Sequence, residues 1–216
     1  ACAPFRRLHL CHHNLETIET TSTAKHDLLA EVCYAAKEEG ASLRSQHGQH
    51  QQTNNDSASQ LCTVLARSFA DIGDIVRGRD LFYGNTHESA QREKLENNLK
   101  KIFQKIYDEV TSSGNNKDTL KTRYQKDGPE FFKLREDWWT ANRETVWKAI
   151  TCDVVSGTYF HATCNSSDTQ GPSQANNKCR CGDGKPKAGK TSDNVNIVPT
   201  YFDYVPQFLR WFEEWA

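Results

Sequence analysis

Apolar side chains recur at three- and four-residue steps in five stretches of the chain, a spacing typical of amphipathic helices. The clearest stretch forms one stripe of Leu95, Leu99, Ile102, Phe103, Ile106, Tyr107 and Val110. We expect four more helices: from Lys25 to a stop at Gly40, from near Ser59 to Gly78, from Pro129 onward and from Pro206 onward. The pattern therefore predicts a mainly α fold, a helical bundle.

The helix that Pro129 opens is expected to lie at the centre of this bundle. Its apolar side chains fall on more than one side: Phe131, Leu134, Trp138, Trp139, Val146, Trp147 and Ile150. A helix that is apolar on several sides is buried on several sides. Strand signals are few, and 201–205 is the one short strand we expect.

Long polar segments separate these helices. Residues 45–57, 111–127 and 165–194 are rich in Asn, Gln, Ser, Lys and Gly and bury little apolar surface, so we expect loops there. We expect residues 1–24 to be an irregular segment and residues 25–216 to form the helical bundle, with a loop over 152–198 that disulfides hold in place (the stapled loop).

Charge and length exclude several classes of protein. The 216 residues carry 27 Lys and Arg against 28 Asp and Glu, so no global field draws the chain to nucleic acid or to an anionic membrane. No apolar run reaches the roughly 18 residues that a membrane-spanning helix needs. The chain begins at Ala1, has no Met and stops within an aromatic helix, so we expect a fragment of a longer protein.

Eight cysteines indicate an oxidising compartment, and four of them flank a segment without a core of its own. Cys179 and Cys181 are poorly placed to bond each other, so we expect them to bond Cys152 and Cys164, in an order that spacing leaves open. Each bridge would contribute about 3 kcal/mol. The alternatives are a zinc site, for which no C-x-x-C pair appears, and free thiols. Cys33 and Cys62 are left open: they bond each other, pair elsewhere or stay unpaired.

Three motifs could indicate a functional site but also have a structural explanation. Residues 184–191 match the phosphate-loop pattern G-x-x-x-x-G-K-[ST], but they lack the strand and helix that such a loop needs, which favours a solvated loop. The histidines of 47–50 lack acidic or thiolate support for a metal. Asp71, Asp74 and Arg77 lie one helical turn apart, and we interpret them as an intrahelical ion-pair ladder rather than an acid–base pair. We expect no cofactor and no metal.

Local basic clusters remain as candidate binding residues. Arg6 and Arg7, and the lysines Lys185, Lys187 and Lys190, would hold a sulfated glycan by charge. The alternatives are a solvated loop for the lysines and structural packing for the two arginines.

Five long blocks carry a family resemblance over essentially the whole chain: CAPFRRLHLC (2–11), LLAEVCYAAKEEG (28–40), LCTVLARSFADIGDIVRGRDLFYGN (61–85), FFKLREDWWTANRETVWKAITC (131–152) and VPTYFDYVPQFLRWFEEWA (198–216). In this order they resemble the alpha-type Duffy-binding-like domain of Plasmodium falciparum erythrocyte membrane protein 1. The chain starts after the N-terminal segment of that family and stops before its third subdomain, so the resemblance implies a partial domain.

The resemblance implies a disulfide-stapled, mostly helical module without enzymatic activity. Such domains are displayed on the extracellular face of the infected erythrocyte membrane, in a variable adhesin with one transmembrane helix outside this stretch. The partners it implies are a host cell-surface glycan (heparan sulfate or a blood-group sugar) or receptor protein, with rosetting as the associated behaviour, and host antibodies. The three polar segments fall where the family varies most.

Two hypotheses of different classes compete with adhesion. One is a structural spacer and antigenic surface with no ligand of its own. The other is a nucleotide enzyme, which depends on residues 184–191 alone.

Overall fold

The structure is a computed structural model that describes residues 2–11, 15, 24–53, 60–112, 114–155, 157, 159, 162–164, 173–175, 178–181 and 197–216. Within these ranges the elements are α1 (Phe5–Leu8), α2 (Ala24–Thr53), α3 (Leu61–Arg77), α4 (Thr86–Ser112), α5 (Lys117–Tyr124), α6 (Phe132–Ile150), the 3-10 helix η1 (Phe202–Tyr204) and α7 (Gln207–Trp215). The predicted mainly α fold is confirmed. None of the described helices is both long enough and apolar enough to cross a membrane.

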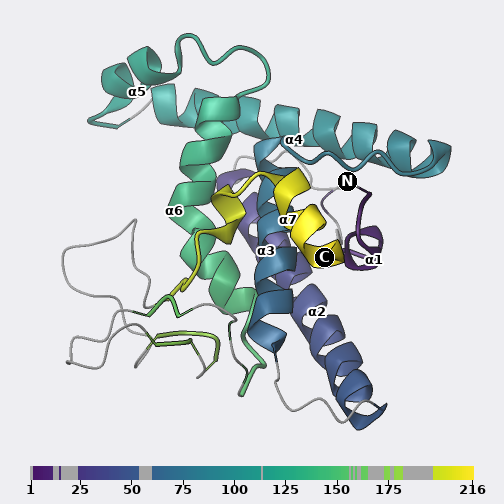
Figure 1. Ribbon diagram of the computed structural model, residues 1–216. Helices are drawn as coiled ribbons and strands as arrows, with labels where there is room; N and C mark the ends of the chain where they lie inside the picture. Colours follow the sequence, from purple (N-terminus) through teal and green to yellow (C-terminus); the bar gives the residue numbers. More distant parts are fainter. Residues whose placement is uncertain are drawn as a thin grey trace.

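The helices α2, α3 and α6 form the centre, and α4 crosses one end of them (Figure 1). α5 folds back beside the C-terminal end of α4, while α7 lies against α3 on the side that carries α1. Both ends of the described chain meet there, because Trp215 Nε1 donates a hydrogen bond to the Cys2 carbonyl oxygen at 2.9 Å.

Aromatic packing between α3 and α6 forms the core. The Phe69 ring has its centroid 5.1 Å from that of Trp139 and 5.1 Å from that of Trp147, and all three side chains are buried. Gly73 allows this close packing, since a Cβ there would lie 2.7 Å from Trp139 Cζ2. The prediction that the tryptophan-rich helix is central is therefore confirmed.

The predicted helix boundaries hold where a local signal sets them. α3 ends at Gly78, which has the left-handed φ of 70° expected of a helix-ending glycine. α7 begins directly after Pro206, which is its N-cap. Pro129 lies in the turn before α6, and the helix itself begins at Phe132.

Four local predictions are wrong. α2 does not stop at Gly40 but continues to Thr53, so 45–53 is helix rather than loop. The polar segment 111–127 contains α5, and 201–205 contains η1 instead of a strand. Residues 54–59 lie outside the described residues. Local propensity is a weak guide to the secondary structure of such polar segments, because tertiary contacts override it.

Candidate functional site

Two disulfides hold the stapled segment. Cys62 in the first turn of α3 bonds Cys179, at a sequence separation of 117, and Cys164 bonds Cys181, at a separation of 17. Trp147 Nε1 also donates a hydrogen bond to the Cys179 carbonyl oxygen at 3.1 Å. Three of the four cysteines predicted to be bridged are bridged, and Cys62 is the partner that spacing left open.

The prediction that Cys152 is bridged is wrong. Cys152 has a free, exposed thiol in the turn after α6. That turn faces α2, where Arg44 donates to the Asp153 carbonyl oxygen at 3.2 Å, while Cys179 folds back onto α3 instead. Burial and the Asp153 carboxylate raise the pKa of the Cys152 thiol. Cys33 on α2 is also free, and burial raises the pKa of its thiol.

The two candidate arginines of the N-terminal segment lie inside the frame. Arg6 donates to Asp71 at 2.8 Å and to Glu214 of α7 at 3.0 and 2.9 Å, and Arg7 pairs with Asp80 at 2.5 Å. Both arginine side chains are only 7% exposed. These contacts favour the packing alternative over glycan binding.

Lys185, Lys187 and Lys190 lie outside the described residues, as do residues 184–191 of the phosphate-loop match. Their role in binding a sulfated glycan stays a prediction. Among the residues that the structure does describe, no group of three His, Cys, Asp or Glu side chains could hold a metal ion.

Asp71 and Asp74 of α3 are the centre of a buried ion-pair network. Arg210 of α7 donates to both carboxylates at 2.6 Å, Arg6 of α1 contacts Asp71, and Arg77 pairs with Asp74 at 2.8 Å. Asp71 and Asp74 are buried. The predicted intrahelical pair therefore exists between Asp74 and Arg77, and the larger role of the network is to join α1, α3 and α7.

The pKa values of the two carboxylates are shifted in opposite directions. Burial alone would raise the pKa of Asp71, but Arg6 and Arg210 outweigh it and hold that pKa below its usual value. For Asp74, burial prevails over Arg210 and Arg77 and raises the pKa to about 6. Burial also raises the pKa of Glu39, which accepts hydrogen bonds from Ser68 and from the Cys11 backbone.

A second buried cluster surrounds Asp203 of η1. Arg143 donates to its two carboxylate oxygens at 3.0 and 2.8 Å, and Trp139 Nε1 donates to it at 2.8 Å. Arg77 links this cluster to the network of α3 through the Asp203 carbonyl oxygen. Buried arginines thus fix the frame, and in this part of the structure they serve packing rather than ligand binding.

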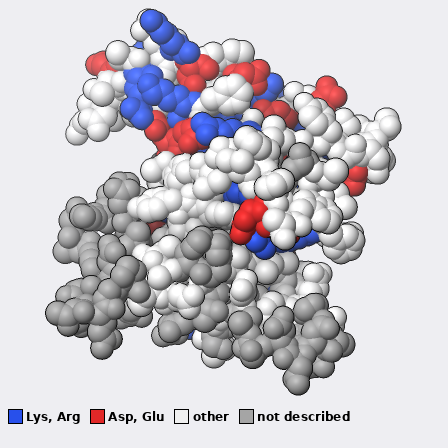
Figure 2. Space-filling model, viewed as in Figure 1, with Lys and Arg blue, Asp and Glu red and all other residues white. Residues whose placement is uncertain are grey.

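Exposed lysines gather on and beside α5, at the end of the molecule where Figure 2 shows Lys and Arg over α4 and α5 among Asp and Glu. We call Lys117, Lys121, Lys126 and Lys133 the α5 basic cluster. Two nearby carboxylates bind protein groups, since Asp137 pairs with Arg123 at 2.6 Å and Asp127 accepts the backbone N–H groups of Lys133 and Leu134, while Asp118 is an exposed acid on α5 itself. The polar pattern of 111–127 predicts a loop and hides the helix on which Lys117 and Lys121 gather, and Lys133 lies beyond that segment on α6.

A helical frame fixed by disulfides and buried ion pairs, with cationic side chains left on its surface, defines a recognition or scaffold domain. The chain belongs to the Duffy binding domain family, whose family model matches residues 1–210.

Solved structures of Plasmodium falciparum PfEMP1 share this fold. The NTS-DBL1-alpha and CIDR-gamma double domain of the varO strain is 42% identical with a TM-score of 0.73, and the NTS-DBL1(alpha-1) domain of that strain is 41% identical with a TM-score of 0.71. Each match covers 100% of this chain, but only 27% and 43% of those chains. The resemblance to PfEMP1 Duffy-binding-like (DBL) domains is confirmed.

Two further relatives carry a receptor in their names. The IT4var13 PfEMP1 DBLbeta domain, solved bound to ICAM-1, is 31% identical with a TM-score of 0.65 and matches 100% of this chain and 44% of its own. The Duffy receptor beta form of Plasmodium knowlesi is 26% identical over 224 residues, which is 100% of this chain and 14% of that protein. These relatives are adhesion proteins, which fits the expectation of a module without enzymatic activity.

Proposed function

We propose that this chain is an extracellular adhesion module of a variant surface antigen, displayed on the infected erythrocyte and binding a host cell-surface receptor or glycan. The observation that carries the proposal is the match of the whole chain to PfEMP1 DBL domains, among them one solved bound to ICAM-1. The frame supports it, because its buried pairs leave the outer surface free to vary without loss of the fold.

For the glycan version of this function, heparan sulfate is the ligand class that the surface suits best. The α5 basic cluster places exposed ammonium groups on one short helix and the turn after it, at Lys117, Lys121 and Lys126. Clustered cations bind sulfates by charge, and salt screens that attraction. Lys185, Lys187 and Lys190 stay separate candidates for glycan binding.

Heparin chromatography of the oxidised chain tests the glycan version. Lys121→Gln with Lys126→Gln should elute at lower salt than the wild-type chain. The matched control is Lys37→Gln with Lys148→Gln, which removes the same charge from exposed positions on α2 and α6 and should elute as the wild type does. Equal elution of both double variants would remove the α5 basic cluster from the site.

Red-cell binding measured by flow cytometry tests adhesion itself. Binding that soluble heparin competes away supports rosetting through a glycan, whereas binding insensitive to heparin supports a receptor protein. A folded, oxidised chain that binds neither red cells nor endothelial cells would favour the structural spacer.

A further inference from the structure

A pocket of about 320 Å³ lies between α1, the C-terminal end of α3 and the first half of α4. Its floor is apolar and is formed by the buried side chains of Leu10, Ile75, Leu95 and Leu99. Pockets that bind organic ligands begin at roughly this size, which suits one large side chain and its neighbour. We call it the α1–α4 pocket.

One wall of the pocket is an aromatic ring between two arginines. The guanidinium carbons of Arg7 and Arg92 lie 4.7 and 5.3 Å from the centroid of Phe82. Both arginines pair with the same carboxylate, that of Asp80, at 2.5 Å. Two cations therefore share one anion at this wall, while Glu88, one helical turn before Arg92 on α4, adds a further carboxylate to the pocket lining.

Arg92 is the accessible member of this wall. Its side chain is 26% exposed against 7% for Arg7, and among the described residues Asp80 is the carboxylate that pairs with it. Two of its guanidinium nitrogens, Nε and Nη2, make no hydrogen bond within the described part of the chain. A guanidinium on an aromatic face, with donors to spare, is suited to bind a carboxylate.

Two of the three other carboxylates around the pocket are neutralised by cations of the protein. Glu96 receives two hydrogen bonds from Arg135, at 2.7 and 2.9 Å, and Glu130 pairs with Lys100 at 2.6 Å. Glu88 closes the N-terminal turn of α4 by accepting the Asn85 backbone N–H at 2.7 Å. A helix N-terminus favours a carboxylate, so this acid is stabilised where it stands.

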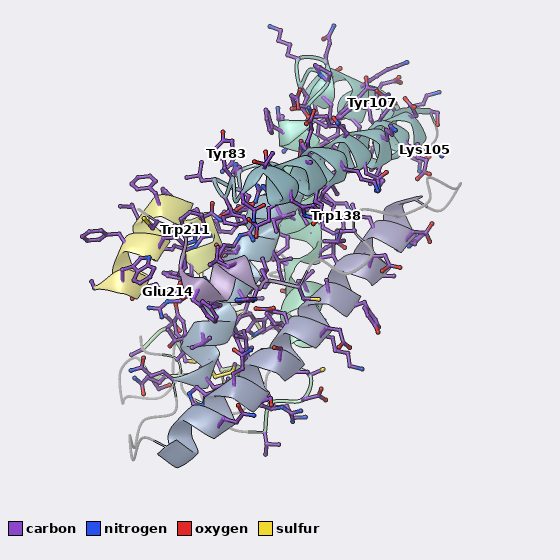
Figure 3. The ribbon with its side chains drawn as sticks, turned by 90° about the vertical axis from the view of Figure 1, so that its right-hand side faces the viewer. Tyr83, Lys105, Tyr107, Trp138, Trp211 and Glu214 are labelled. Carbon is purple, nitrogen blue, oxygen red and sulfur yellow. A yellow bond between two sulfur atoms is a disulfide. The ribbon has the colours of Figure 1, made fainter. Side chains whose placement is uncertain are left out.

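The mouth of the pocket is apolar. Leu8 of α1 and Phe132 of α6 line it, and these residues are 45% and 46% exposed. Tyr83, next to Phe82, is 80% exposed and projects beside the first turns of α4 (Figure 3). Exposed aromatic and aliphatic side chains around a concave floor are typical of protein-binding sites.

We propose that the α1–α4 pocket binds a segment of a host receptor protein that presents a large apolar side chain next to a carboxylate. The apolar side chain enters between Leu95 and Leu99, and the carboxylate pairs with Arg92. A sulfated glycan fits worse, because the floor offers it no donors. This inference rests on the proposed adhesive function and names the chemistry of one contact within it.

Peptide titrations followed by ¹H–¹⁵N NMR test the pocket directly. The probe is acetyl-Gly-Asp-Trp-Gly-amide. Two comparison peptides each remove one feature: one has Asn in place of Asp, and the other has Ala in place of Trp. We expect shifts at the backbone amides of Phe82, Arg92 and Leu95, and weaker binding of both comparison peptides. Arg92→Gln should lower the affinity for the Asp-Trp peptide about tenfold, since a charge-assisted hydrogen bond is lost. Arg7 still pairs with Asp80 in that variant, which protects the fold.

Two matched controls separate this site from general effects of charge. Arg79→Gln removes an exposed arginine that pairs with Glu136 outside the pocket, and it should leave peptide binding unchanged. Leu8→Asp places a repelling carboxylate at the mouth and should weaken binding, whereas Phe5→Asp on the same helix, at a residue that does not line the pocket, should not.

The outcomes distinguish the pocket from the adhesive function. Cell binding by the chain without peptide shifts at the pocket would overturn this inference and leave adhesion standing. Peptide binding without cell binding would support the pocket and contradict adhesion. If Arg92→Gln changes heparin elution but not peptide binding, the pocket contacts a glycan and the inference is wrong.

Discussion

Gly40 of α2 and Ile150 of α6 are in backbone contact. A Cβ built on Gly40 would lie 2.0 Å from the Ile150 carbonyl oxygen, a distance that no side-chain carbon can occupy. The glycine is therefore needed for the close approach of two helices, and the end of α6 is held against the middle of α2 at this point.

Gly40→Ala should destabilise the chain, although alanine favours helix formation by roughly 1 kcal/mol. Forcing an atom into a packed backbone contact costs about 1–3 kcal/mol or more, so the steric cost prevails. Gly48→Ala is the matched control, because Gly48 lies in the same helix with nothing within 4 Å of its Cβ position. Urea unfolding should show a loss of stability for the first variant and a small gain for the second. Stabilisation by Gly40→Ala would contradict the contact.

Gly40 also shows what the sequence could and could not predict. Helical spacing correctly placed the three helices whose apolar stripes meet in the core, and Gly78 correctly ended α3. A glycine after an apolar stripe has two explanations, a helix end or a close approach. Which explanation holds depends on the contact with Ile150, 110 residues further along the chain, and rules based on neighbouring residues do not include that contact.

The sequence contains a pattern that indicates a buried arginine on α6. Trp139, Arg143 and Trp147 follow one another at four-residue steps, so Arg143 lies on the aromatic face of α6. An arginine within a buried stripe requires a carboxylate partner, but the sequence does not say that Asp203 supplies it. The link from Cys62 to Cys179 was hidden for the same reason, because the partners are far apart in the chain.

The two disulfides should contribute unequally to stability. In the chain-entropy model, the loop closed over 117 residues is worth about 5 kcal/mol and the loop closed over 17 residues about 3 kcal/mol. Replacing Cys62 and Cys179 by Ala should therefore lower the urea midpoint more than replacing Cys164 and Cys181. The reverse order would show that the shorter loop carries more of the native structure.

Thiol labelling tests the pairing itself. Under native, non-reducing conditions iodoacetamide should label Cys152 and leave Cys179 unlabelled; labelling speeds up as the thiolate forms, and the raised pKa of Cys152 moves that increase to higher pH than for a thiol with the ordinary pKa. Peptide mapping should recover a fragment that joins Cys62 to Cys179. A fragment joining Cys152 to Cys179 or Cys181 would restore the pairing first expected from the sequence.

Asp74 should make stability depend on pH between about 4 and 6. The pKa of Asp74 is about 6 in the folded chain and near 3.8 when unfolded, so the folded state binds the proton more tightly. Its stabilising contribution is complete below the unfolded pKa and is lost as pH rises through 6. The free energy of unfolding of the wild-type chain should thus fall relative to that of Asp74→Asn over this window, by roughly 1–3 kcal/mol.

Urea titrations of both chains at several pH values measure this difference. Asp71 does not obscure it, because Arg6 and Arg210 keep the pKa of Asp71 below 3.8, and its contribution is lost only at lower pH. Glu39 has a raised pKa in both chains and cancels in the comparison. A difference that stays flat from pH 4 to 7 would mean that Asp74 is ionised throughout.

Burial should determine how much each of two similar Arg–Asp pairs contributes to the stability of the fold. Arg143 and Arg123 each donate two hydrogen bonds to one aspartate, but Asp203 is buried, whereas the Arg123 side chain is 46% exposed and that of Asp137 is 33% exposed. Asp203→Asn should cost about 3 kcal/mol or more, because it leaves the Arg143 charge buried without its counter-ion. Asp137→Asn makes the same chemical change at the surface, where solvent hydrates the released arginine, and should barely move the urea midpoint. Equal losses in the two variants would contradict the assignment of Asp203 as the anion that fixes η1 against α6.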